Sequence, residues 1–166
     1  MNLDLVPLGW LHFAASAAAL VVGLMMLVGP KGTAVHKSRG RVYVLSILVT
    51  SLTAFGIYRL GRFYFPHWFA VASLVVTSIG LAAARFKRPR RAWRHLHLTA
   101  MLASVYILIG GGVNEAFLRV NALHRLIADF NSPVIGMTHL AVMLLFVVLI
   151  GYFNALLLLR RRALAA

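Results

Sequence analysis

The sequence predicts an all-α membrane protein built as a five-helix transmembrane bundle, and three observations lead to this fold class. Hydrophobic residues make up 61% of the 166 residues, and charged residues make up only 12%. A soluble domain of this size does not show these proportions. The apolar residues also fall into five runs close to the ~20 residues that cross a bilayer as a helix. The runs cover residues 7–28, 41–60, 65–84, 93–113 and 133–159, and we expect them to form a single polytopic membrane domain.

Residues that favour helix ends separate these runs. In order along the chain they are Gly29-Pro30 after the first run, Gly61 after the second, Pro66 at the start of the third and Ser132-Pro133 before the fifth. Proline is tolerated in the first turn of a helix, and glycine followed by proline stops one. The first run has neither a basic leader nor a small-residue cleavage site, so we expect it to be kept as a membrane helix.

The positive charge is gathered in three places and predicts the topology. The basic residues are Lys31, Lys37, Arg39 and Arg41 in the first loop, Arg85, Lys87, Arg88, Arg90, Arg91 and Arg94 in the third, and Arg160, Arg161 and Arg162 at the end. Short basic loops stay in the cytoplasm. The N-terminus, which carries Asp4, is then outside, and the C-terminus is cytoplasmic. The net charge of +14 therefore indicates topology and not nucleic-acid binding.

The connection between the fourth and fifth runs, residues 114–132, predicts an amphipathic helix on the outer membrane surface. Its apolar residues recur at helical spacing and are Ala116, Val120, Leu123, Ile127 and Phe130. Its polar residues, Arg119, Asn121, Arg125 and Asp129, fall elsewhere on the helix, and His124 lies on the polar side. A helix of this kind lies in the interface and does not cross the membrane.

The fourth run presents two polar faces. One face reads His97, Met101, Ser104, Leu108, Gly111 and Glu115, and the opposite face reads His95, Thr99, Leu102, Tyr106, Gly110 and Val113. The glycines from Gly110 to Gly112 make this helix thin, which would admit a ring or a neighbouring helix, or would kink it. Glu115 either binds a ligand or pairs with Arg119 one turn later.

The histidines fall into two layers once the topology is assigned. His12 and His139 enter their helices from the outer side to similar depths, with His67 and Glu115 slightly shallower. His36 in the first loop and His95 and His97 at the start of the fourth run form a cytoplasmic layer. Ionisable side chains within membrane spans are costly and are functional candidates. His67, His95 and His124 also fit an interfacial role without a ligand.

Imidazoles from different helices are a common way to hold haem b. His12 with His139 fits an outer haem. An inner haem would use His97 or His95 with His36, or His97 with Met101 as a sulfur ligand. The alternative is copper or zinc at the outer surface, held by His12, His67, His139 and Glu115. The chain contains no cysteine, which excludes disulfides and thiolate sites. It also lacks phosphate-loop, zinc-protease and serine-elbow motifs.

Several segments resemble one family of bacterial membrane proteins. They are LHFAASAAALVVG, Gly29-Pro30, VHKSRGRVYV, PHWFAVASL, and His97 to Met101 with Tyr106 and Glu115. Together they are similar to the family classed as domain of unknown function 2306, with one departure, because Val105 separates Ser104 from Tyr106. The resemblance implies a small multi-pass protein of the bacterial inner membrane and raises His12, His36, His97 and Glu115 as site residues. The histidine layout is also similar to that of transmembrane di-haem b cytochromes, by analogy alone.

The leading hypothesis is an inner-membrane protein that binds haem b or a similar redox centre and passes electrons between quinone or an outer donor and a partner. The first alternative is an accessory or structural subunit of a larger membrane complex, which the small-residue stripe Ser16, Ala19 and Gly23 favours as a packing surface. The second alternative is the copper or zinc site.

Overall fold

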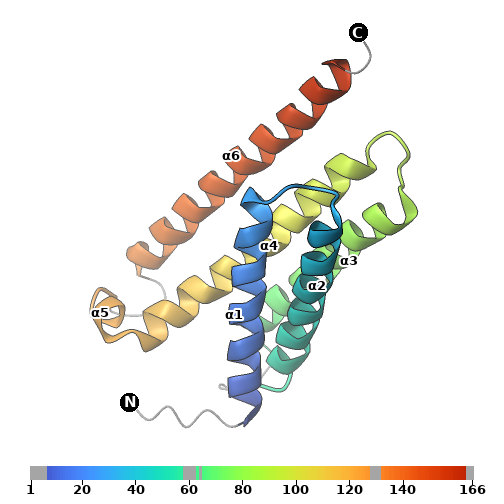
Figure 1. Cartoon of the computed structure of the whole chain (residues 1–166). Helices are drawn as coiled ribbons and strands as arrows, with labels where there is room; N and C mark the ends of the chain where they lie inside the picture. Colours follow the sequence, from blue (N-terminus) through green and yellow to red (C-terminus); the bar gives the residue numbers. More distant parts are fainter. Residues whose placement is uncertain (1–6, 58–62, 64, 128–131, 164–166) are drawn as a thin grey trace. The chain divides into compact units, whose positions relative to one another are not determined.

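The computed structural model describes residues 7–57, 63, 65–127 and 132–163, and the regular elements in these ranges are helices (Figure 1). The elements are α1 (Pro7–Val28), α2 (Ala34–Ala54), α3 (Phe65–Phe86), α4 (Trp93–Arg119), α5 (Asn121–His124) and α6 (Pro133–Ala163). The all-α class is confirmed. The chain divides into two compact units, Met1–Thr77 and Ser78–Ala166, with the boundary inside α3. The single domain expected from the sequence stays a prediction.

Four of the described helices are long and apolar enough to cross a membrane. They are Pro7–Val28, Pro66–Phe86, Trp93–Arg119 and Pro133–Arg160. α2 has 21 residues, but Lys37, Arg39 and Arg41 lie near its start and lower its apolar character. A multi-pass helical membrane protein is therefore supported by four helices, and the predicted fifth span is not confirmed.

The first two helices show where apolar patterning succeeds and where it misses. α1 begins at Pro7 and ends at Val28, as predicted. α2 begins at Ala34 and not at Arg41, because the Thr33 hydroxyl caps it by accepting the His36 amide hydrogen at 3.1 Å. His36 therefore lies in the first turn of α2 and not in the loop, which corrects its predicted position. α2 also ends earlier than predicted, at Ala54 with Phe55 as its C-cap, and not at residue 60. Gly61 and Asp4 lie outside the described residues.

A further boundary difference is at the end of α4. This helix continues past the predicted end at Val113 to Arg119, and Val120 then takes an extended conformation with φ −86° and ψ 111°. α5 is a separate helix of 4 residues. The single amphipathic helix expected over residues 114–132 is thus not confirmed, and residues 128–131, including Asp129 and Phe130, lie outside the described ranges.

In the first unit, α1 packs along α2 (Figure 1). Ala19 and Gly23 are buried in α1, and Tyr43 and Ile47, each 1% exposed, are buried in α2. Small residues on α1 leave room for the larger side chains of α2. The stripe of small residues predicted from the sequence is therefore a helix-packing face.

The loop between α1 and α2 is held by Lys31. Its ammonium group donates hydrogen bonds to the main-chain carbonyls of Met26 and Leu27 at the end of α1. A cation there satisfies carbonyls that have no partner within the helix. Partial burial removes water from the ammonium group and lowers the pKa of Lys31.

In the second unit, α4 has two neighbours. The end of α3 approaches it closely at Gly80, where an added Cβ atom would lie 3.2 Å from the Cβ of Ala100. α6 packs against another side of α4 and runs antiparallel to it (Figure 1). α4 is thus the helix that the other two long segments of this unit share.

Candidate functional site

The strongest polar cluster joins the start of α4 to the last third of α6. His95, Thr99 and Asn154 form it, and we call it the His95 cluster. The Asn154 amide nitrogen donates to the Ile150 carbonyl at 2.8 Å and to the Thr99 hydroxyl at 3.1 Å. Because the Ile150 carbonyl can only accept, the orientation of the amide is fixed. Its oxygen then accepts a hydrogen from Nδ1 of His95 at 2.6 Å.

This arrangement defines the tautomer of the neutral His95 ring. Nδ1 carries the hydrogen, so the neutral ring presents Nε2 as an acceptor. Nε2 is buried and has no hydrogen-bond partner among the described residues. The ring is therefore oriented by α6 while one of its nitrogens remains unsatisfied, which is unusual for a buried polar atom.

A second polar contact lies toward the other end of the same interface. Nε2 of His139 on α6 is 2.9 Å from the Asn114 side-chain oxygen on α4. The ring passes over Gly110, whose added Cβ atom would lie 3.7 Å from Cε1 of His139. The glycines make α4 thin enough at this point to admit the ring of His139. This agrees with one of the alternatives drawn from the sequence, namely that the glycines admit a ring. We call His139 and Asn114 the His139 pair.

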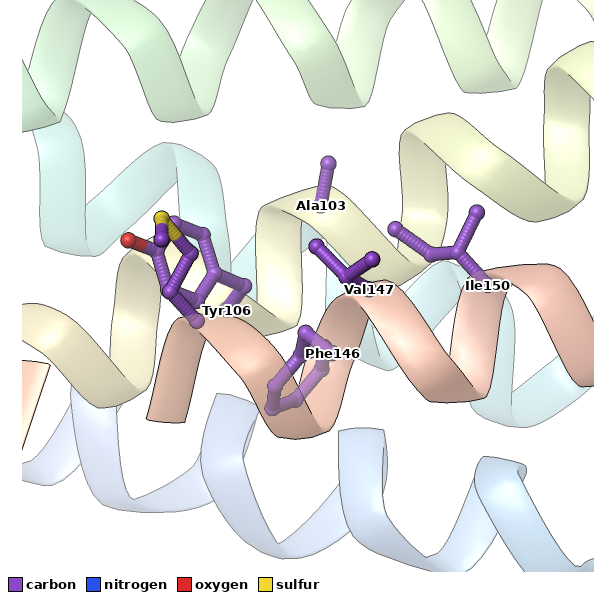
Figure 2. A pocket seen from close by; sticks show the side chains of 6 residues that line it. Ala103, Tyr106, Phe146, Val147 and Ile150 are labelled. Carbon is purple, nitrogen blue, oxygen red and sulfur yellow. The ribbon is translucent and has the colours of Figure 1, made fainter. Parts of the chain in front are cut away.

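Apolar side chains fill the interface between these two polar contacts. A small cavity of about 100 Å³ lies there, lined by Ala103 and Tyr106 of α4 and by Met143, Phe146, Val147 and Ile150 of α6. Figure 2 shows these side chains on the two helices. Apolar cavities of ~150 Å³ can hold a benzene-sized molecule. This one is too small for a macrocycle and is best described as a packing defect between α4 and α6.

His97 lies on the other side of α4 and contacts α3. Its Nδ1 donates a hydrogen bond to the Gly80 carbonyl oxygen at 2.8 Å. Since a carbonyl only accepts, the hydrogen is on Nδ1 and the neutral ring presents Nε2 as its basic nitrogen. Histidines that bind metals or haem are commonly oriented by such a bond from the other ring nitrogen.

His12 in the first unit has the same arrangement. Its Nδ1 donates to the Thr50 carbonyl oxygen at 2.9 Å and lies 3.0 Å from the Thr53 hydroxyl. The Thr53 hydroxyl itself donates to the Val49 carbonyl at 2.7 Å, so its oxygen is available to accept from His12. α2 therefore holds the His12 ring in one orientation and places the basic position of the neutral ring on Nε2.

Three other predicted residues have identifiable local contacts. Glu115 pairs with Arg119 on the next turn of α4, which confirms the ion-pair alternative at this position. His67 is 1% exposed, and its ring stacks on Phe63 with centroids 4.7 Å apart. His124 is exposed on α5 and donates to the Phe117 carbonyl at 3.2 Å.

The predicted ligand sets combine residues of both units and stay predictions. His12 and His36 belong to the first unit, and His97 and His139 belong to the second, so neither haem pair lies within one unit. The copper or zinc set is divided in the same way. Within the described ranges there is no group of three or more His, Cys, Asp or Glu side chains that could hold a metal ion.

The two asparagines that orient the histidines of α4 and α6 were not predicted from the sequence. Asn154 lies within an apolar run in α6, and Asn114 lies one residue before Glu115 in α4. A lone amide within an apolar helix is a signal in its own right, because its polar atoms need partners on another helix. That signal marks Asn154, whereas Asn114 lay beyond the predicted span.

The length and apolar character of four described helices indicate a multi-pass helical membrane protein. No family model, no curated protein and no solved structure matches the chain.

Proposed function

We propose that the chain is a five-span protein of the bacterial inner membrane with its N-terminus outside and its C-terminus in the cytoplasm. α2 supplies the fifth span in addition to the four longer apolar helices. Lys37, Arg39 and Arg41 then lie at the cytoplasmic interface, where long basic side chains reach the head groups. The basic hairpin between α3 and α4 lies on the same side of the membrane.

The function that the geometry supports best is the binding of a redox cofactor, with haem b as the best match, in an electron-transfer protein. The observation that carries it is the shared arrangement of His12 and His97. In each, Nδ1 donates to a main-chain carbonyl of another helix, at 2.9 Å and 2.8 Å respectively. This bond fixes the orientation of the ring and is the usual outer partner of a ligating histidine.

The other two proposed ligands are less well arranged. His139 directs Nε2 to Asn114, so it would have to give up that hydrogen bond to serve as a ligand through the same nitrogen. His36 lies in the first turn of α2. His12 and His97 are thus the residues on which the proposal depends, and His139 and His36 are the partners it retains from the sequence.

A bound haem would supply one-electron chemistry, and the chain's own residues would set its environment. The carbonyls of Thr50 and Gly80 hold the two rings, and the apolar helices exclude water. Quinone or an outer protein donor is the proposed electron source, and a larger respiratory-type complex is the proposed partner.

The test is the visible absorption spectrum of the purified full chain, with and without added haem. We expect a Soret band whose intensity falls in His12→Ala and in His97→Ala. His124→Ala is the matched control, because His124 is exposed on α5, and its spectrum should equal that of the unmodified protein. The absence of a Soret band under both conditions would refute the proposal, as would equal losses in all three variants.

A second candidate function, an accessory subunit of a larger membrane complex, is favoured by the surface of α6. In the most apolar 18-residue stretch of this helix, only 6% of the residues are buried within the described structure. Met137, Val147 and Val148 are 69%, 59% and 67% exposed. Such a surface suits a partner helix as well as lipid. Release of a co-purifying protein by substitutions at Met137 and Val148, with the spectrum unaltered, would support this function.

A further inference from the structure

A groove lies where the end of α3 meets the start of α4. It has a volume of about 380 Å³ and is lined by Ile79, Ala82, Ala83 and Phe86 of α3, Leu96 of α4 and Arg88 of the hairpin between them. Its lining is apolar apart from the one guanidinium group. Phe86 is 69% exposed, so the groove includes an apolar surface that reaches the outside of the unit.

The surroundings of this groove are strongly basic. The hairpin and its flanks carry Arg85, Lys87, Arg88, Arg90, Arg91 and Arg94. The sequence from residue 5 to residue 114 contains no acidic residue, and Glu115 at the other end of α4 is paired with Arg119. No carboxylate of α3, α4 or the hairpin therefore neutralises the positive charge beside the groove.

We propose that this groove binds one anionic phospholipid, with its phosphate on Arg88 and an acyl chain along Ile79, Ala82 and Phe86. The ligand must have an apolar part to match the lining and an anionic end to match Arg88, and an anionic phospholipid has both. Arginine suits this role because its planar guanidinium group can form two parallel hydrogen bonds to phosphate oxygens. Basic pockets between helices on the cytoplasmic side are typical sites for anionic head groups.

The charge has a second role, in topology, but topology alone does not explain the groove. The positive-inside effect depends on the number of basic residues near a span and needs no concave apolar surface beside them. Here the groove and one particular arginine coincide, while Arg90 belongs to the same hairpin and does not line the groove. Substituting each of these two arginines in turn therefore distinguishes a specific binding site at Arg88 from a general effect of the positive charge of the hairpin.

The experiment is native mass spectrometry of the full chain, purified in detergent, stripped of lipid and titrated with phosphatidylglycerol or with phosphatidylcholine of the same acyl chains. We expect the first phosphatidylglycerol to bind at least tenfold more tightly than phosphatidylcholine. Arg88→Gln should weaken that binding about tenfold, as expected for loss of one charge-assisted contact. Arg90→Gln should change it by less than about twofold.

A second variant tests the apolar half of the site. Ala82→Phe fills the groove without altering charge and should also weaken binding of phosphatidylglycerol. Equal affinities for the two lipids would overturn the proposal, and so would equal effects of Arg88→Gln and Arg90→Gln. Millimolar inorganic phosphate should not displace the lipid. If phosphate does displace it, and the Ala82→Phe variant binds phosphatidylglycerol as tightly as the unmodified protein, the groove is a phosphate site and the lipid assignment is refuted.

Discussion

Replacing Asn154 by leucine should separate α6 from α4 at the His95 cluster. The substitution keeps a side chain of similar size but removes both hydrogen bonds that cross between the two helices. These are the bond from His95 at 2.6 Å and the bond to Thr99 at 3.1 Å. The Ile150 carbonyl loses the hydrogen bond from the Asn154 side chain, but it remains part of the α6 backbone, so its loss is small.

The expected loss follows from counting these bonds. Hydrogen bonds between membrane helices contribute ~0.6 kcal/mol on average and at most ~1.7 kcal/mol each, so the two bonds together account for about 1 kcal/mol. His95 would then have neither ring nitrogen paired, since its Nε2 has no partner among the described residues even before the change. A buried polar group left unpaired costs ~1–3 kcal/mol. We expect Asn154→Leu to lower the free energy of unfolding by about 2 kcal/mol.

The assay is reversible unfolding of the full chain in mixed micelles with increasing amounts of a denaturing detergent. Val148→Ala, at a position that is 67% exposed on α6, serves as the control and should change the free energy by less than about 0.5 kcal/mol. The double variant His95→Phe/Asn154→Leu should be more stable than Asn154→Leu alone, because it leaves no unpaired imidazole. A loss below about 0.5 kcal/mol for Asn154→Leu, or simple additivity in the double variant, would contradict this account.

Two further predictions concern α3 and α4. Gly80→Ala should destabilise the protein by about 1 kcal/mol in the same unfolding assay, because its new Cβ atom would lie 2.8 Å from Sδ of Met101, whereas Gly111→Ala, with nothing within 4 Å, should be neutral or stabilising by up to ~1 kcal/mol. Equal effects would refute the close approach at Gly80. Glu115→Gln should cost no more than about 0.5 kcal/mol, since its ion pair with Arg119 is exposed, and a larger loss would indicate a further role for this carboxylate.

Helix existence was predictable from the sequence, whereas helix ends were predictable only where composition changes sharply. α1 ends at Val28 because Gly29 and Pro30 follow it. α2 begins earlier than its apolar run because hydropathy does not register the Thr33 cap or a basic first turn. α4 continues for six residues past Val113, and the ion pair between Glu115 and Arg119 stabilises this added segment. Apolar runs mark membrane thickness, and helices can extend beyond it.

The site was predictable as residues but not as contacts. His12 and His139 were selected because imidazoles within apolar runs need partners, and each has one. His97 was selected as part of the cytoplasmic layer of histidines, and it too has a partner. The identity of these partners depends on which faces of two helices meet. Tertiary packing determines which faces meet, and the spacing of residues along a single helix does not reveal it. Asn114 and Asn154 therefore became recognisable as partners only when α4 and α6 were placed side by side.

His95 and His97 have a joint consequence for α4 as a mechanical part. They are two residues apart and so point about 200° apart around the helix axis. One is tied to an amide of α6 and the other to a carbonyl of α3. Rotation of α4 about its own axis therefore carries both rings sideways, away from their acceptors. The two hydrogen bonds together fix the rotational position of α4 about its axis. A conformational change that rotates α4 would have to break both bonds.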